Sequence, residues 1–393
     1  MIHFLELIFW LSIFFVFYAY VLFPLQLNFF ALSKSQNTFV YKENEEELPQ
    51  VAILLAVYNE ELVIEQKLKS TFDTGYPLHK IRFHIGSDSS TDATDSIIQE
   101  YQKKYPQLNL KVFPKRTGKA GIVNQLEAEA KAEVLILTDA NVFFEHDTIY
   151  NLVKHYKNEE IALVGGNIIN NKLHKTGISV QEKTYLSREN KIKYQEGAVW
   201  GTMIGAFGGC YSIRKKYFSP VPPKFFMDDF YITMSVLEQG KKAINALDAR
   251  CTEDVSNKIS EEFRRKVRIS IGNFQNLFRF KKLLFSSFPG LSFCFWSHKV
   301  LRWLGPFFIL ATFFANLALI AQSDFYATTL FLQMLLFSIP IVDELLKKIK
   351  IHLSLLRFVS HFYLMNLALL IGFFRFVFGV ESNVWKPTQR FQE

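Results

Sequence analysis

Asp139 and Asn141 come directly after a short apolar stretch, Val134 to Leu137. Branched apolar residues in so short a run predict a buried strand. Ligands bind where the strands of an open parallel sheet end, so both side chains are expected at its working edge. Their oxygen atoms, two positions apart, suit Mg²⁺ or Mn²⁺ shared with phosphate groups. A plain turn is the alternative, because Asp and Asn also bend chains locally.

A second acidic pair, Asp228 and Asp229, begins a predicted helix that continues to Gln239 and stops at Gly240. Two carboxylates at a helix N-terminus can be a favourable cap. A carboxylate there can also accept the proton of an attacking hydroxyl group. The pair is therefore a candidate for general base catalysis.

Alternating apolar and amphipathic segments predict the scaffold that positions these groups. Strands are expected over residues 51–57, 81–86, 110–113 and 133–139, with helices over 59–72, 93–105 and 117–131. Such alternation predicts βαβ units and a mostly parallel sheet, with a further strand over 161–166 and a charged helix over 179–195.

Right-handed crossovers would bring Tyr58, Asp88, Lys119 and Asp139 towards one edge of this sheet. Taken one at a time, Tyr58 is compatible with surface packing and Asp88 with an Asx turn. Lys119 is compatible with a solvated charge and Asp139 with a bend. Together they offer an aromatic platform, a carboxylate for a ribose or base, a cation for phosphate and a metal ligand. Gly118 and Lys119 lack the remaining residues of an ATPase phosphate loop.

Two later segments could complete a site. Residues 197–211 contain five glycines, which permit close approach of a ligand to the backbone or form a bulged strand. Residues 261–282 predict an amphipathic basic helix that either lies on a membrane or directs arginines to a diphosphate. Both readings of that helix can hold, since they use different faces.

The composition predicts a membrane protein. The 393 residues are 49% hydrophobic and include 41 phenylalanines, and uncharged runs cover 7–33, 303–323, 325–342 and 358–374. We expect four crossings, with residues 283–297 in the interface. Lys and Arg beside these runs place the central region in the cytosol and both termini outside, although Lys386 and Arg390 oppose this weakly.

The chain is thus expected to be a multi-pass integral membrane protein, in the plasma or inner membrane if bacterial. Its net charge of +8 arises largely beside apolar segments, which favours anionic lipid headgroups over nucleic acid as partners. The three cysteines have no spacing typical of zinc or disulfide frameworks.

Six motifs occur in the order seen in membrane-bound family 2 glycosyltransferases, which include cellulose, hyaluronan and poly-N-acetylglucosamine synthases. The chain resembles that family over roughly residues 50–280. Six motifs in register are more specific than any one of them. They are Ala56–Glu61, Ser87–Asp92, Arg116–Asn124, Thr138–Asn141, Asp228–Asp229 and Arg265–Ile269.

The resemblance implies a GT-A (Rossmann-like) α/β fold, a nucleotide-sugar donor, a divalent metal and inversion at the anomeric carbon. It assigns the donor to Tyr58, Glu60, Asp88, Lys119 and Asp139, and the metal to Asp139 and Asn141. Asp229 would be the base, and Arg268 with Arg265 would stabilise the departing nucleotide. Gly205, Gly208, Gly209 and Asp228 would lie on the acceptor side.

A literal Thr252-Glu253-Asp254 competes for the role of base. Asp254 lies 11 residues before Arg265, whereas Asp229 lies 36 before it and leaves room for a strand and turn. We therefore expect Asp229. Asn141 replaces the second Asp of the family's DxD motif, and Arg265 and Ile269 replace the Gln and Trp of QxxRW.

The expected domain organisation is a membrane helix (1–33), a linker (34–48), a GT-A domain (49–260), interfacial helices (261–298), three membrane helices (299–380) and a tail (381–393). The predicted function is transfer of a sugar, probably from a UDP-sugar, to a polysaccharide or lipid-linked acceptor. A non-catalytic nucleotide-sensing membrane protein is the alternative, and Asn141 is its best support.

Overall fold

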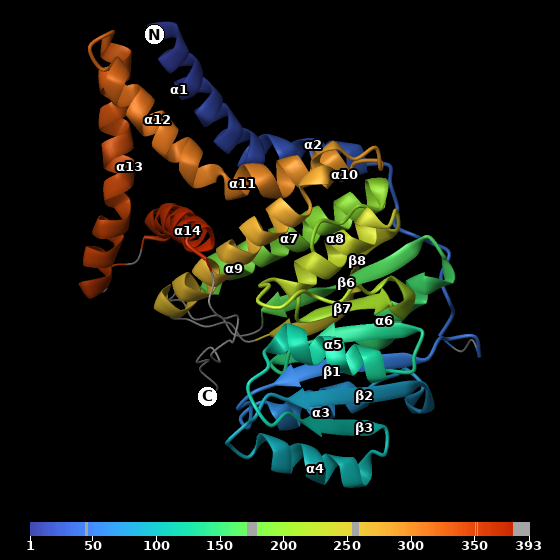
Figure 1. Cartoon of the computed structure of the whole chain (residues 1–393). Helices are drawn as coiled ribbons and strands as arrows, with labels where there is room; N and C mark the ends of the chain where they lie inside the picture. Colours follow the sequence, from blue (N-terminus) through green and yellow to red (C-terminus); the bar gives the residue numbers. More distant parts are fainter. Residues whose placement is uncertain (44–45, 171–178, 254–258, 350, 352, 380–393) are drawn as a thin grey trace.

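An eight-stranded sheet organises residues 51–253 of the computed structural model (Figure 1), in the order β3-β2-β1-β4-β7-β6-β8-β5. The structure describes all residues except 44–45, 171–178, 254–258, 350, 352 and 380–393. The parallel half consists of β3 (Leu108–Val112), β2 (Ile81–Ser87), β1 (Val51–Val57) and β4 (Val134–Thr138). The other half is mixed and contains β7 (Cys210–Arg214), β6 (Ile161–Asn170), β8 (Lys242–Glu253) and β5 (Val142–Phe144).

The predicted α/β fold is therefore confirmed, with corrections at the ends of elements. The helix expected from residue 59 begins five residues later, as α3 (Ile64–Phe72). The backbone N–H of Glu60 donates to Thr94 and that of Glu61 to Asp92, so these residues link two loops instead of starting a helix. β3 begins two residues earlier than expected, and residues 142–144 form a separate edge strand, β5.

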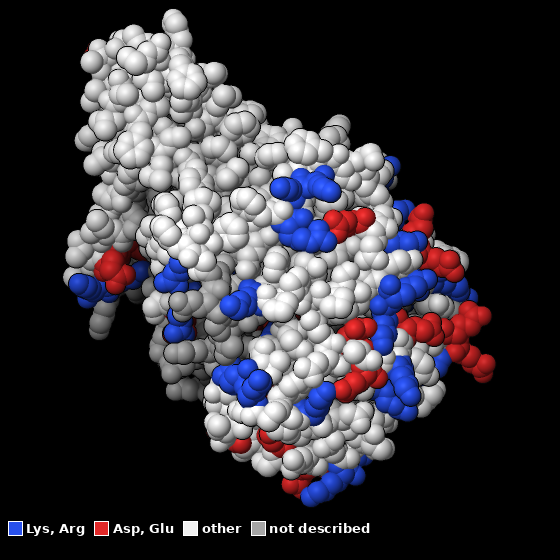
Figure 2. Space-filling model, in the orientation of Figure 1, with Lys and Arg blue, Asp and Glu red and all other residues white. Residues whose placement is uncertain are grey.

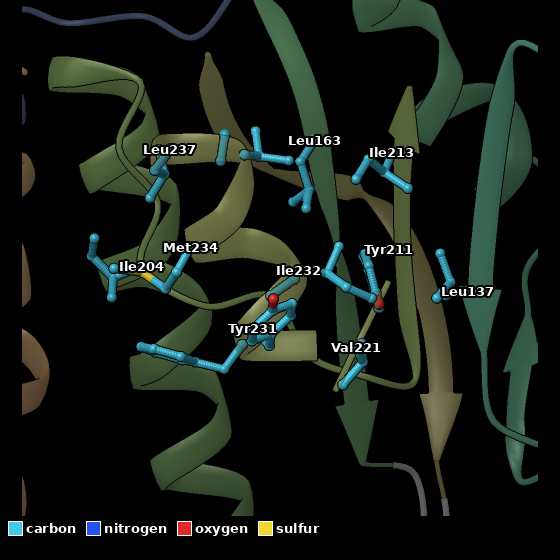
Figure 3. Close-up of a cluster of buried hydrophobic side chains, with 14 of the residues drawn as sticks. Leu137, Leu163, Ile204, Tyr211, Ile213, Val221, Tyr231, Ile232, Met234 and Leu237 are labelled. Atoms are coloured by element: carbon cyan, nitrogen blue, oxygen red, sulfur yellow. The ribbon is translucent and has the colours of Figure 1, made fainter. Parts of the chain in front are cut away.

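Helices cover both faces of the sheet. They include α4 (Thr94–Lys104), α5 (Lys119–Glu129), α6 (Thr148–Val153), α7 (Ser179–Trp200) and α8 (Asp228–Glu238). Figure 3 shows Ile232 and Met234 of α8 within the same apolar cluster as Leu163 and Ile213 of the sheet. α5 packs so closely on β2 that a Cβ at Gly86 would lie 2.3 Å from Ile122 Cγ2. The absence of a side chain at this position lets α5 pack closely on β2.

Apolar helices extend away from this domain. They are α1 (Ile2–Phe17), α2 (Phe23–Ala31), α12 (Gly305–Leu319), α13 (Asp324–Lys348) and α14 (Ser354–Val377). Within the described part of the chain, three helical segments are long and apolar enough to cross a membrane, or up to four if the bent pair Leu291–Trp303 and Gly305–Leu319 is one span. Figure 2 shows that charged side chains on this face gather over the sheet domain and leave most of the α1, α12 and α13 surface uncharged.

The first apolar segment bends at a π-helical turn, Tyr18–Leu22, between α1 and α2. The Phe23 N–H reaches back to Tyr18 O, which leaves the Ala19 carbonyl to accept from Arg302 Nε at 3.3 Å. Pro24 has no N–H, and the Tyr20 carbonyl accepts from Arg188 instead. Two arginines thus satisfy the carbonyls that the bend releases.

A buried ion cluster connects α7 to the segment before α12. Both ring nitrogens of His298 face carboxylates, Glu196 at 2.7 Å and Glu189 at 3.0 Å. Lys299 and Arg302 also pair with Glu189. We call these five residues the His298 cluster.

α14 lies across α9 (Ile259–Arg279), the basic helix expected from the sequence. Figure 1 shows α14 nearly end-on while α13 is seen from the side, so α13 and α14 cross each other instead of running parallel. Ser270 Oγ of α9 donates to Leu369 O at 2.8 Å, and a Cβ at Gly372 would lie 2.3 Å from Ser270 Cβ. The missing side chain at Gly372 permits this contact.

Replacing Gly372 by Ala should push α14 away from α9. Overpacking of this kind costs about 1–3 kcal/mol, which exceeds the roughly 1 kcal/mol that Ala gains in a helix. We expect a lower melting temperature in detergent. The double variant Gly372→Ala/Ser270→Gly should lose less stability than the two single losses combined, and strict additivity would contradict the contact.

Candidate active site

The loops after β1 and β2 meet around Asp88, which is fully buried. Its carboxylate accepts from Arg116 Nε at 3.1 Å and from the backbone N–H groups of Thr117 and Gly118 at 2.5 and 3.1 Å. The Arg116 guanidinium lies 3.4 Å from the centre of the Tyr58 ring. Asp88 therefore shapes the loop that leads into α5, and its contact with a nucleoside stays a prediction.

Glu60 lies two residues beyond Tyr58 and is half-buried. Its backbone N–H donates to Thr94 Oγ1 at 2.8 Å, which fixes the loop to the start of α4. Arg116 was not among the expected site residues, although it stands in one of the motifs. Its position over Tyr58 makes it part of this surface.

Lys119 joins the two acidic segments that lie far apart in the sequence. Its Nζ is 2.8 Å from Asp139 Oδ1 and 3.6 Å from Asp228 Oδ2. Burial alone would lower the pKa of Lys119, but Asp139 and Asp228 outweigh it, so the pKa is raised and the ammonium stays charged. The end of β4 and the start of α8 consequently form one site.

Asp229 lies beside the glycine-rich loop. Its Oδ1 accepts from the Phe230 N–H at 2.7 Å, and a Cβ at Gly208 would lie 2.9 Å from its Oδ2. Burial and the neighbouring Asp228 raise the pKa of Asp229 to about 6, while Lys119 and Lys193 oppose the shift. A carboxylate with such a pKa is suited to accept a proton near neutral pH.

The glycines of this loop have different surroundings. Gly205 adopts φ +78°, and a Cβ there would lie 2.5 Å from the Phe230 ring. Gly209 is buried, and a Cβ there would lie 2.6 Å from Val142 Cγ2. Of the three glycines expected on the acceptor side, Gly208 adjoins Asp229, whereas Gly205 lies against Phe230 and Gly209 packs into the core. Residues 202–209 form an irregular loop and not a bulged strand.

The turn after β4 is held by the hydrogen bonds of two side chains, Lys67 and Asn141. The buried Lys67 Nζ donates to Thr138 Oγ1 at 2.7 Å and to Val142 O at 2.6 Å, which clamps both ends of the turn. Asn141 Nδ2 donates to Glu253 Oε1 at 2.8 Å. Glu253 belongs to the literal Thr252-Glu253-Asp254, whose Asp254 lies outside the described residues.

The oxygen donors at this turn fit a divalent cation that a substrate also binds. Within the described residues, no group of three His, Cys, Asp or Glu side chains is placed to hold a metal by itself. Mg²⁺ commonly needs only one or two carboxylates when phosphate oxygens complete its shell. The Asp139 carboxylate and the Asn141 amide oxygen meet that requirement, with Glu253 as an adjacent negative charge.

Both predicted arginines lie on α9. Arg265 Nη1 is 3.5 Å from Glu262 Oε2. Burial and Arg265 lower the pKa of Arg268, against the opposing charges of Asp139, Asp228 and Asp229. Arg268 therefore lies within electrostatic range of all three carboxylates, and it is exposed enough to meet a ligand.

α9 lies close to the residue that precedes Asp228 and Asp229, and the close contact is at Gly272. A Cβ there would lie 2.5 Å from Met227 Cγ, and Met227, at φ +58°, precedes Asp228 directly. β8 supplies the strand that the spacing between Asp229 and Arg265 requires. The structure thus brings Lys119, Asp139, Asp228, Asp229 and Arg268 together.

Lys67, Lys193 and Glu253 were not predicted. Lys67 and Lys193 are buried lysines on helices α3 and α7, and the sequence alone gives no reason to distinguish them from solvated charges. Glu253 had a signal, since it belongs to the tripeptide set aside as the base.

The chain is similar to several known proteins. Residues 52–220 match "Glycosyl transferase family 2". The chain is 31% identical over 156 residues to the probable glycosyltransferase YdaM of Bacillus subtilis. The matched residues cover 39% of this chain and 37% of that protein. It is 33% identical over 125 residues to the beta-monoglucosyldiacylglycerol synthase of a Nostoc species, covering 31% of this chain and 27% of that protein.

A longer match, at 26% identity over 282 residues, is to the poly-beta-1,6-N-acetyl-D-glucosamine synthase of Staphylococcus aureus, covering 67% of this chain and 66% of that protein. The solved structure of the mannosyltransferase PcManGT from Pyrobaculum calidifontis, in complex with GDP-Man and Mn²⁺, has a TM-score of 0.72. It covers 95% of this chain and 99% of its own at 18% identity, which shows a shared fold. Residues 52–220 thus match a family 2 glycosyltransferase domain, and the chain has the GT-A fold.

Proposed function

We propose that this protein transfers a sugar from a nucleotide-sugar donor, UDP-linked, to a glycan or lipid-linked acceptor at a membrane, with inversion at the anomeric carbon. The observation that supports the proposal is the contact of Lys119 with both Asp139 and Asp228, because Asp229 follows Asp228 directly in the chain. The domain family and the names of the relatives support the reaction class.

Residues on the β1, β2 and β4 side would hold the donor. Tyr58, with Arg116 over its ring, offers a flat surface for a nucleobase, and Lys119 offers positive charge to the diphosphate. Asp139 and Asn141 would hold Mg²⁺ or Mn²⁺, which when bound neutralises the developing charge of the leaving diphosphate. The Mn²⁺ and GDP-mannose of the related fold support this arrangement.

Asp229 would remove the proton of the acceptor hydroxyl as it attacks the anomeric carbon. The new carbon–oxygen bond forms on the face opposite the departing nucleotide, so the configuration inverts. Arg268, with Arg265 behind it, would stabilise the nucleoside diphosphate that leaves. Gly208 leaves the space next to Asp229 through which an acceptor reaches the base.

The membrane would present the acceptor. We place α1, α12 and α13 across the bilayer, with the sheet domain in the cytosol, consistent with their exposed apolar surface. The fourth crossing expected from the sequence is α14, which packs across α9 instead, so this placement has three crossings. The relatives named as diacylglycerol and polysaccharide synthases support both lipid and glycan acceptors.

Membranes containing the protein should transfer label from one nucleotide-sugar in a panel of UDP- and GDP-sugars with Mn²⁺. A ladder of labelled products indicates polymerisation, and one lipid-soluble product indicates single transfer. Tight donor binding without transfer or hydrolysis would instead favour a nucleotide sensor.

Changing Asp229 to Asn should lower kcat by about 10²–10⁴-fold, because the amide cannot accept the proton. Donor binding, measured by calorimetry, should stay nearly intact, since Lys119 and Asp139 are unchanged. The control is Asp254→Asn, the carboxylate of the competing tripeptide, which should retain activity. Loss of donor binding in Asp229→Asn would show that Asp229 has another role.

The pH profile should report the same carboxylate. Asp229 acts in its ionised form, so kcat/KM should fall as the pH drops through about 6 and stay level above it. Asp228, Lys119 and Lys193 are the charged groups that act on Asp229. Lys193→Gln removes a charge that lowers the pKa, so the acidic limb should move to higher pH. An unchanged limb would contradict this assignment.

A further inference from the structure

A pocket lies between the bent N-terminal segment and α7, away from the active site. It has a volume of about 260 Å³. Val21, Pro24 and Leu25 form an apolar wall, and Arg188 and Lys191 of α7 contribute positive charge. We call it the α2–α7 pocket. Asn28 and Gln195, which also line it, are hydrogen-bonded to each other at 2.7 Å.

The two cations are available to a ligand. Arg188 and Lys191 are three positions apart, so they lie on one face of the helix, and both are exposed. Neither forms an ion pair with an acidic side chain among the residues that the structure describes. Glu189, their nearest acidic neighbour in sequence, pairs with His298, Lys299 and Arg302 in the His298 cluster.

The arginine is also fixed in place. Arg188 donates to the Tyr20 carbonyl, which is left without its helical partner because Pro24 has no N–H. This hydrogen bond holds the guanidinium at the bend where the pocket opens. A guanidinium has further N–H donors for a second acceptor.

The pocket lies at the border between apolar and charged surface. Figure 1 shows α2 leaving the end of α1 and running between the apolar helices and the sheet domain. Leu25 and Phe29 of α2 are 58% and 71% exposed, so an apolar face continues outward from the wall of the pocket. If α1 crosses a bilayer, this face lies among the acyl chains and the cations lie among the headgroups.

We propose that the α2–α7 pocket binds the phosphate group of an anionic phospholipid, with the acyl chains along Leu25 and Phe29. Arg188 and Lys191 would contact the phosphate oxygens. A free phosphate or nucleotide explains the cations but leaves the adjoining exposed apolar face without a partner. The proposal rests on the membrane association in the proposed function and is independent of sugar transfer.

The test is lipid retention by the full-length protein. Protein from nanodiscs of phosphatidylcholine with phosphatidylglycerol is transferred to mild detergent, and retained lipid is identified by native mass spectrometry. We expect wild type to retain phosphatidylglycerol, and Arg188→Gln/Lys191→Gln to bind it about thirtyfold more weakly, equivalent to about 2 kcal/mol. Lys103→Gln/Lys104→Gln on α4, far from α2 in Figure 1, is the matched control and should behave as wild type.

Three outcomes would overturn the proposal. They are equal retention of phosphatidylglycerol by the pocket variant, equal retention of phosphatidylcholine by wild type, and displacement of the lipid by millimolar inorganic phosphate. Should Arg188→Gln fail to fold, Lys191→Glu leaves the Tyr20 contact intact and must still weaken retention. A protein that transfers sugar but retains no anionic lipid would contradict this proposal alone.

Discussion

The repulsion among three carboxylates is the constraint around which the sheet domain of this protein is arranged. Asp139, Asp228 and Asp229 come together at one edge of the sheet, and Lys119 contacts two of them. Positive charge at that point is what lets the acids share the site at neutral pH. Lys119 begins α5, which lies close on β2 at Gly86.

Other contacts in the fold also help to position these charged groups. Lys67 clamps the turn that carries Asp139, Gly208 makes room beside Asp229, and Gly272 lets α9 approach the residue before Asp228. Each is a contact across elements. The small residues matter here because a side chain at either glycine would separate the groups that chemistry requires to be adjacent.

The parallel half of the sheet and the meeting of Lys119 with Asp139 followed from the sequence, because strand period, crossover handedness and motif order all agree. The start of α3 did not, since Glu60 and Glu61, at the expected start of the helix, are engaged by loop hydrogen bonds to Thr94 and Asp92. Lys67 and Glu253 were missed because their roles arise from long-range packing. The direction of α14 could not be predicted from the sequence either, because the length and hydropathy of a helix do not determine how it crosses its neighbours.

The His298 cluster has a consequence for how the two halves of the protein move. Buried ion pairs add little net stability, but separating them leaves uncompensated charge in a dry interior, which is strongly unfavourable. α7 and the segment leading into α12 are therefore expected to tilt as a single rigid unit. If α12 crosses a bilayer as proposed, the height of Asp229 above that bilayer is then fixed, and an acceptor has to be long enough to reach it.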